Sequence, residues 1–191
     1  MQTKHILLCG DRGVGKSTLI QKLLQANTRP VYGFYTKRLA ADETGFHPIY
    51  IYEASDPIRS HTDENQIGTC DSKIHNVSIE VFNRLGAQYI RQAQPGGVIV
   101  MDELGFMEAQ AETFVQAVFE ALDGDIPIIA AVKSRYDVPF LNEVRAHPKG
   151  AVYHIDESNR DSLLTELLPI IRDWNGKEKS ANTQCVTAGV K

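Results

Sequence analysis

The sequence predicts an α/β protein, with a mainly parallel β-sheet, helices on both faces of the sheet and an inserted β-hairpin. Short apolar runs bounded by Gly, Pro and polar residues alternate with segments whose apolar residues recur every three or four positions. Two of these runs, VIVM and IPIIAAV, are almost wholly apolar, as expected for strands buried on both faces. Strands that alternate with helices favour a parallel sheet in a three-layer arrangement.

The elements can be assigned in chain order from these patterns. Apolar residues at helical spacing begin at Leu19, Val77, Phe114 and Leu163, and each such stripe is expected to pack in the core. Residues 33–54 alternate in character around the turn signal Asp42-Glu43-Thr44-Gly45, which predicts the hairpin. The other strands are expected at His5–Cys9, Val31–Lys37, Val98–Met101, Ile126–Val132 and Ala151–Ile155.

Two segments do not fit this alternation. Residues 55–73 are polar, and such a long segment without predicted structure is either a functional lid or disordered. From residue 175 onward the periodicity is lost, which favours a flexible C-terminal tail. The chain therefore divides into one domain, residues 1–174, and a tail, residues 175–191.

Composition narrows the class of protein. The chain has 191 residues with 42% hydrophobic residues, typical of a globular domain. Its 20 basic and 24 acidic residues do not favour a nucleic-acid partner. No apolar run approaches 18 residues, so no membrane partner is expected. Three scattered cysteines without a signal peptide favour a cytoplasmic protein with reduced thiols.

The segment GDRGVGKST follows the first predicted strand and opens the first predicted helix. It matches the phosphate-loop pattern G-x-x-x-x-G-K-[ST] in full. Backbone N–H groups of such a loop bind phosphate oxygens, the lysine contacts the β- and γ-phosphates, and the serine coordinates Mg²⁺. A three-layer P-loop NTPase fold is therefore expected, in which the nucleotide-binding residues are Gly10, Asp11, Arg12, Gly13, Val14, Gly15, Lys16, Ser17 and Thr18.

A second motif supplies two carboxylates. The run VIVM ends in Asp102 and Glu103, the form of a Walker-B strand. Asp102 is expected to share Mg²⁺ with Ser17, and Glu103 to accept a proton from an attacking water. The alternative for Glu103 is an acidic residue stabilised by a helix N-terminus.

These motifs resemble those of the cancer-related nucleoside-triphosphatase family of small P-loop enzymes. GDRGVGKSTL, GFYTKR, TGF, VIVMDELGFME and NRD occur in the family's order between about Lys4 and Asp173. The resemblance implies Mg²⁺-dependent hydrolysis of ATP, GTP and other nucleoside triphosphates, with one strand between the Walker-A and Walker-B strands. The chain departs from the family pattern at Asp11-Arg12, at Lys37, where an acid is common, and at Phe106, where a lysine is common.

An additional cation is expected at the transferred phosphate. Arg160 is the leading candidate, because it follows the last predicted strand and begins the last helix. The competing interpretation is a capping box formed by Ser158 and Asp161. Weaker candidates are Lys133, Arg135 and Arg145, and the aromatic residues Tyr136 and Phe140 could flank a base or pack in the core.

Two other functions share this scaffold. A nucleoside or nucleotide kinase would transfer phosphate to an acceptor, but its usual arginine-rich lid is missing from residues 55–73, which contain only Arg59 and Lys73 as cations. An ATP-dependent regulatory module would bind nucleotide with negligible turnover. Guanine selectivity through an [NT]-K-x-D motif is not expected, because VKSRYD lacks the required residues.

Overall fold

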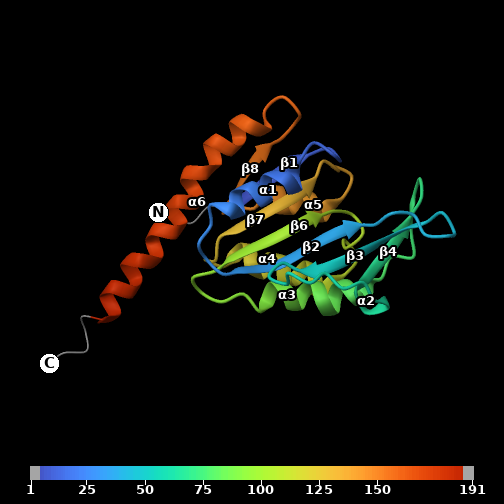
Figure 1. Ribbon diagram of the computed structural model, residues 1–191, viewed down its shortest axis with the longest axis horizontal. Helices are drawn as coiled ribbons and strands as arrows, with labels where there is room; N and C mark the ends of the chain where they lie inside the picture. Colours follow the sequence, from blue (N-terminus) through green and yellow to red (C-terminus); the bar gives the residue numbers. More distant parts are fainter. Residues whose placement is uncertain (1–4, 187–191) are drawn as a thin grey trace.

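The computed structural model describes residues 5–186, with side chains described for residues 5–176. One eight-stranded sheet has the order β5-β4-β3-β2-β6-β7-β1-β8 (Figure 1). The first five strands in sequence are β1 (His5–Gly10), β2 (Val31–Arg38), β3 (His47–Glu53), β4 (Gln66–Cys70) and β5 (Ile74–His75). They are followed by β6 (Val98–Leu104), β7 (Ile128–Lys133) and β8 (Gly150–His154).

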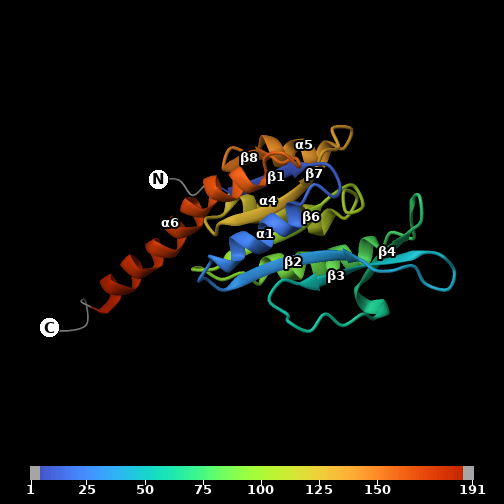
Figure 2. The ribbon, with the colours of Figure 1, turned by 45° about the horizontal axis from the view of Figure 1, so that its top comes forward.

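Helices cover both faces of this sheet, as predicted (Figure 2). Side chains of α1 and α6 pack in one apolar cluster, and those of α3, α4 and α5 pack in the other. A π-helical turn (Phe82–Gly86) joins α2 to α3. The helices are α1 (Lys16–Gln25), α2 (Ile79–Val81), α3 (Ala87–Arg91), α4 (Glu112–Asp123), α5 (Pro139–Ala146) and α6 (Arg160–Val186).

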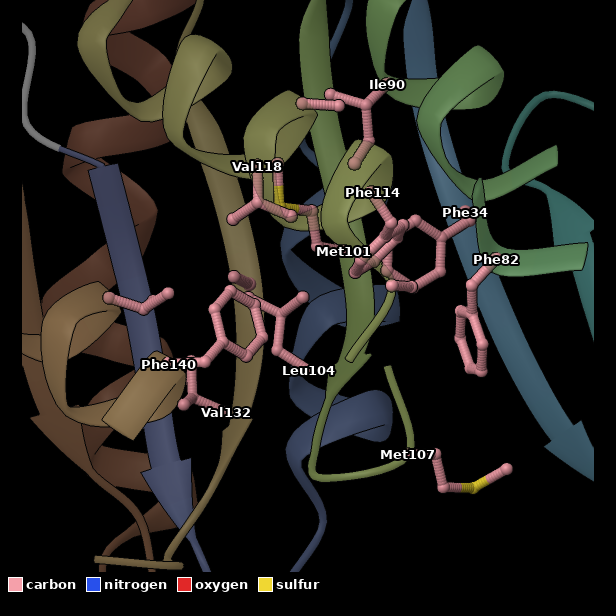
Figure 3. Close-up of a cluster of buried hydrophobic side chains, with 14 of the residues drawn as sticks. Phe34, Phe82, Ile90, Met101, Leu104, Met107, Phe114, Val118, Val132 and Phe140 are labelled. Atoms are coloured by element: carbon pink, nitrogen blue, oxygen red, sulfur yellow. The ribbon is translucent and has the colours of Figure 1, made fainter. Parts of the chain in front are cut away.

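The larger core cluster lies beneath α3, α4 and α5 (Figure 3). Phe114 of α4 packs edge-on against Phe34 of β2 and Phe82, with ring centroids 5.4 and 5.5 Å apart. Each fully buried side chain of this size contributes about 1.5–3 kcal/mol through burial alone. Because Phe34 is on β2 and Met101 on β6, this cluster fixes the strands that end at the functional site.

The sheet changes direction at β2. The pairs β2–β6, β6–β7, β7–β1 and β1–β8 are parallel, whereas the pairs β2–β3, β3–β4 and β4–β5 are antiparallel. The predicted hairpin is therefore confirmed as β2–β3, with Gly45 at a φ of 83° in its turn. Strand β7 lies between β1 and β6, as the family resemblance implied.

Two expectations require correction. The segment 55–73 is not uniformly structureless, because it contains β4, whose pairing with β3 extends the sheet. The segment from residue 175 begins as a continuation of α6, which runs to Val186. Asn175 anchors this region, since its side chain donates to Ala26 O at 2.9 Å. Residues 187–191, the rest of the expected tail, lie outside the described residues.

Within the described residues, none of the helices combines the length and apolarity needed to cross a membrane. The carboxyl ends of the parallel strands β1, β6 and β7 meet at one edge of the sheet. In sheets of this type, ligands bind at that edge.

Candidate active site

The phosphate loop connects β1 to α1 through a backbone that requires glycine. Gly13 and Gly15 have φ angles of 86° and 104°, in the left-handed region that other residues rarely adopt. At Gly10, a Cβ atom would lie 2.3 Å from the backbone oxygen of Ile155. Buried β1 therefore ends in a tight turn, and α1 begins at Lys16 with its N-terminal N–H groups at the loop. This is the arrangement that binds phosphate.

Lys16 is held inside this loop. Its side chain is only 5% exposed, so its charge needs partners. The ammonium donates to Gly10 O and Asp11 O, both at 2.8 Å, and its Nζ lies 2.9 Å from Glu103 Oε1. Lys16 and Glu103, which are far apart in sequence, therefore lie in contact.

Ser17 and Asp102 form the second pair. Ser17 Oγ donates to Asp102 Oδ1 at 3.0 Å. Burial raises the pKa of Asp102 to about 6, while the Ser17 hydrogen bond opposes this shift. A buried carboxylate beside a hydroxyl favours a hard cation, which would relieve the cost of burying the negative charge.

These two oxygen donors fit Mg²⁺, which is usually bound by one or two protein ligands together with water and substrate phosphates. Across the described residues, no group of three or more His, Cys, Asp or Glu side chains is placed to hold a metal. Ser17 and Asp102 remain the pair that could hold the ion.

Glu103 lies between two cations. Its Oε1 contacts Lys16, and its Oε2 lies 3.6 Å from Lys133 Nζ at the end of β7. The side chain is 22% exposed, so water can reach it. Glu103 thus contacts two cations and remains accessible to water.

At Phe106, where a lysine is common in the family, a cation from a neighbouring strand, Lys133, lies beside the aromatic ring. Its Nζ lies 5.3 Å from the centroid of the Phe106 ring, so a cation from β7 stands beside the aromatic residue that replaces the common lysine. Lys37 is exposed on β2, paired with Tyr50 in the sheet register. Of the weaker cation candidates, Lys133 is therefore the one that contacts Glu103.

Arg160 lies next to the phosphate loop. A Cβ atom placed on Gly15 would be 3.5 Å from Arg160 Cδ and 3.7 Å from its Nη1. The competing capping box is wrong, because the Ser158 hydroxyl donates to Asp156 Oδ1 at 2.6 Å, while Asp161 lies 3.5 Å from Lys22 Nζ. The Asp156 turn accounts for the start of α6 and leaves Arg160 directed at the loop.

Four other candidates make contacts with residues outside the phosphate loop. Arg135 pairs with Asp137 at 2.6 Å, and Arg145 donates to Lys133 O at 2.9 Å. Phe140 packs against Phe119 in the core, at a centroid distance of 6.0 Å. Tyr136 is 65% exposed, with the Arg145 guanidinium 4.5 Å from its ring centroid.

The sequence predicts no site role for Arg59 or Glu108. The Arg59 guanidinium lies 5.0 Å from the centroid of the Tyr35 ring, and Tyr35 is paired with Asp102 across the sheet. The charge of Arg59 lowers the pKa of Asp102, although burial raises this pKa by more. Glu108 is buried and accepts a hydrogen bond from Gly105 N, and burial raises its pKa to about 7. Arg59 lies outside the quoted motifs, and Glu108 is the last residue of VIVMDELGFME, but only the fold shows that both lie near Asp102 and Glu103.

Two cavities meet at the phosphate loop. The smaller, about 280 Å³, is lined by residues of the loop and α1, including Gly13, Lys16 and Thr18. The larger, about 480 Å³, extends from the loop towards the antiparallel strands. Arg12 and Glu103 line both cavities, so the expected γ-phosphate position lies at their junction.

The fold and this constellation define a P-loop nucleoside-triphosphatase. The family model described as NTPase matches residues 5–168, and the chain belongs to that family of enzymes. The chain is 31% identical over 166 residues to the nucleoside-triphosphatase THEP1 of Methanosarcina acetivorans, covering 83% of this chain and 91% of the relative. It is 29% identical over 184 residues to the human cancer-related nucleoside-triphosphatase, covering 88% and 97%.

Solved structures support the fold. The crystal structure of THEP1 from Aquifex aeolicus aligns with a TM-score of 0.69 and 22% identity, over 87% of this chain and 98% of the other. The solution structure of a human cancer-related nucleoside triphosphatase aligns with a TM-score of 0.62 and 24% identity, over 99% and 100%. The predicted fold and family are both confirmed.

Proposed function

We propose that this protein hydrolyses nucleoside 5′-triphosphates, including ATP and GTP, to the diphosphate and phosphate in a Mg²⁺-dependent reaction. The observation that carries the proposal is the pairing of Lys16 with Glu103 and of Ser17 with Asp102, which joins the phosphate loop to the end of β6 through two contacts. The family membership and the names of the relatives agree with this activity. A cytoplasmic location, where Cys9 and Cys70 would remain free thiols, is part of the same proposal.

The phosphate loop supplies binding and charge. Backbone N–H groups of the loop and the Lys16 ammonium hold the β- and γ-phosphates, and Thr18 contacts the α-phosphate. Ser17 and Asp102 would hold Mg²⁺, which when bound neutralises charge on the β- and γ-phosphates. Arg160, beside Gly15, adds a positive charge at the transferred group.

Glu103 supplies the proton acceptor. Its Oε2 edge faces Lys133 and the larger cavity, from which water approaches the γ-phosphorus. Phosphate oxygens at Lys16 share the ammonium with Glu103 and so weaken its hold on the carboxylate. Glu103 then orients the water and accepts its proton while the bond to the β-phosphate oxygen breaks.

Phosphate release from ATP and from GTP, with Mg²⁺ or with EDTA, tests this proposal. We expect release that depends on Mg²⁺ and falls about 10²–10³-fold in Lys16→Ala, the scale seen when one transition-state contact is removed. Lys22→Ala is the matched control, because Lys22 lies on the same helix and is 46% exposed. Equal rates for wild type and Lys16→Ala would contradict the proposal.

A further inference from the structure

The larger cavity has more room than the attacking water of the proposed hydrolysis needs. Its volume of about 480 Å³ lies in the range of small-molecule sites. It is formed by the ends of β2, β6 and β7 on one side and the β3–β4–β5 extension on the other. Figure 1 shows the β2–β3 turn and the β4–β5 hairpin projecting beyond the central strands at this end.

Both cations and carboxylates line this cavity, and three of its cations have no carboxylate partner among the described residues. Arg38 and Lys73 line its far wall and Arg12 lines its near end. In the part of the chain whose side chains are described, none of these three forms an ion pair. Like charges gathered around a hollow repel one another, and an anion bound between them relieves that repulsion.

Of the four acidic residues that line the cavity, Asp71 and Glu108 accept hydrogen bonds from other groups. Asp71 accepts from Lys73 N at 2.6 Å and from the His75 ring at 3.0 Å. Glu108 is buried and accepts from Gly105 N. Among the described residues, neither of these carboxylates forms an ion pair with Arg38 or Lys73. Apolar side chains complete the floor, namely Ile49, Ile67, Ile74, Phe82 and Met107.

We infer that this cavity binds a second substrate, a small alcohol that carries a phosphate or carboxylate group, and that the enzyme transfers the γ-phosphate to its hydroxyl. The anionic group lies at Arg38 and Lys73, and the hydroxyl lies at Glu103, the residue shared with the phosphate cavity. A hydroxyl fits this position because Glu103 can accept its proton, whereas an attacking phosphate oxygen would be repelled there. This inference rests on the γ-phosphate position of the proposed function.

In the transfer step, one bond to the γ-phosphorus forms and another breaks. The acceptor oxygen forms a bond to the γ-phosphorus, and its proton passes to the Glu103 carboxylate. The bond between the γ-phosphorus and the β-phosphate oxygen breaks, and the nucleoside diphosphate leaves with that electron pair. Glu103 then releases the proton to solvent, and the product is a phosphate ester of the acceptor.

The test uses ATP labelled with ³²P at the γ-phosphate and four acceptors: glycerol 3-phosphate, ribose 5-phosphate, AMP and 3-phosphoglycerate. We expect label on at least one acceptor and a fall of about tenfold or more in kcat/KM for transfer in Arg38→Ala and in Lys73→Ala. Phosphate release without acceptor should stay within about twofold of wild type in both variants, since neither residue lines the phosphate cavity.

Lys37→Ala is the matched control, because Lys37 alternates with Thr36 and Arg38 on β2 and does not line the cavity. Calorimetric titration of the same four compounds into the protein with a non-hydrolysable ATP analogue measures binding independently of chemistry. No label and no binding, or transfer that Arg38→Ala and Lys73→Ala leave unchanged, would overturn the inference. A wild type that transfers label but releases no phosphate without acceptor would instead overturn the proposed hydrolase and keep the acceptor site.

Discussion

The parallel half of the sheet and its antiparallel extension hold their charged residues in different ways. At the ends of β1 and β6, Lys16 and Asp102 are almost fully buried and paired with neighbouring groups. On the extension, Arg38 and Lys73 are exposed and line an open cavity. Buried pairs fix the geometry that phosphoryl transfer requires, whereas exposed cations can adapt to a ligand. Under the proposed function, the buried pairs perform the chemistry and the exposed cations select what reacts.

A substitution at the junction of these two halves is expected to have the largest effect on stability. Gly33 of β2 has a φ of 95°, and a Cβ atom there would lie 2.0 Å from the backbone oxygen of Val100 on β6. We expect Gly33→Ala to lower the free energy of unfolding by about 3–5 kcal/mol, measured by urea denaturation, through strain and displacement of the paired strands.

Gly45→Ala is the control for backbone strain alone. Its φ of 83° is similar, but no atom lies within 4 Å of the added Cβ. We expect a cost of about 1–2 kcal/mol. Equal costs at the two glycines would show that the close β2–β6 contact does not matter.

The raised pKa of Glu108, which lies between the two halves, predicts that the free energy of unfolding depends on pH. Its pKa of about 7 in the folded protein exceeds the ordinary 4.5, so the folded state binds its proton more tightly than the unfolded state. Its contribution is therefore full below about pH 4.5 and is lost as the pH rises through 7. Glu108→Gln should be more stable than wild type at pH 8 by about 3 kcal/mol and similar at pH 4.5, measured by urea denaturation at each pH. A constant difference across this range would contradict the assignment.

Substitution of Arg160, beside the phosphate loop, tests whether this arginine acts on the transferred phosphate. Removing one hydrogen-bonding charge at the transferred phosphate costs about 1.5–3 kcal/mol, so Arg160→Ala should lower kcat for phosphate release about 10–100-fold. Arg172→Ala, an exposed arginine on the same helix, should change little. If both variants behave alike, Arg160 does not act on the phosphate.

Substitution of Lys133 is expected to have the smallest effect on phosphate release. Its Nζ is 3.6 Å from Glu103 and partly exposed, so the pairing is worth no more than about 1 kcal/mol. Lys133→Met should reduce phosphate release about threefold to fivefold, measured at saturating ATP. A loss as large as that of Arg160→Ala would place Lys133 on the transferred phosphate instead of on Glu103.

The same comparison explains which features the sequence could predict. The phosphate loop and Asp102-Glu103 are set by local spacing, because strand ends in a parallel sheet meet at one edge. Strand β4 was missed because QIGTC is short and polar and is stabilised by pairing with β3. The larger cavity joins β2, β4–β5, β6 and β7, and the loops that follow β1 and β6, so no single segment indicates it. The role of Lys133 at Phe106 likewise depends on the packing of β7 beside β6.

The central claim is that Glu103 activates the nucleophile while Lys16 and the loop bind the phosphates. Single-turnover phosphate release by Glu103→Gln, measured together with its affinity for ATP, tests it most directly. We expect the affinity for ATP to stay within about threefold of wild type while the rate falls about 10²–10⁴-fold, because the amide occupies the same space but cannot accept the proton. A variant that binds ATP normally and releases phosphate at the wild-type rate would contradict the account.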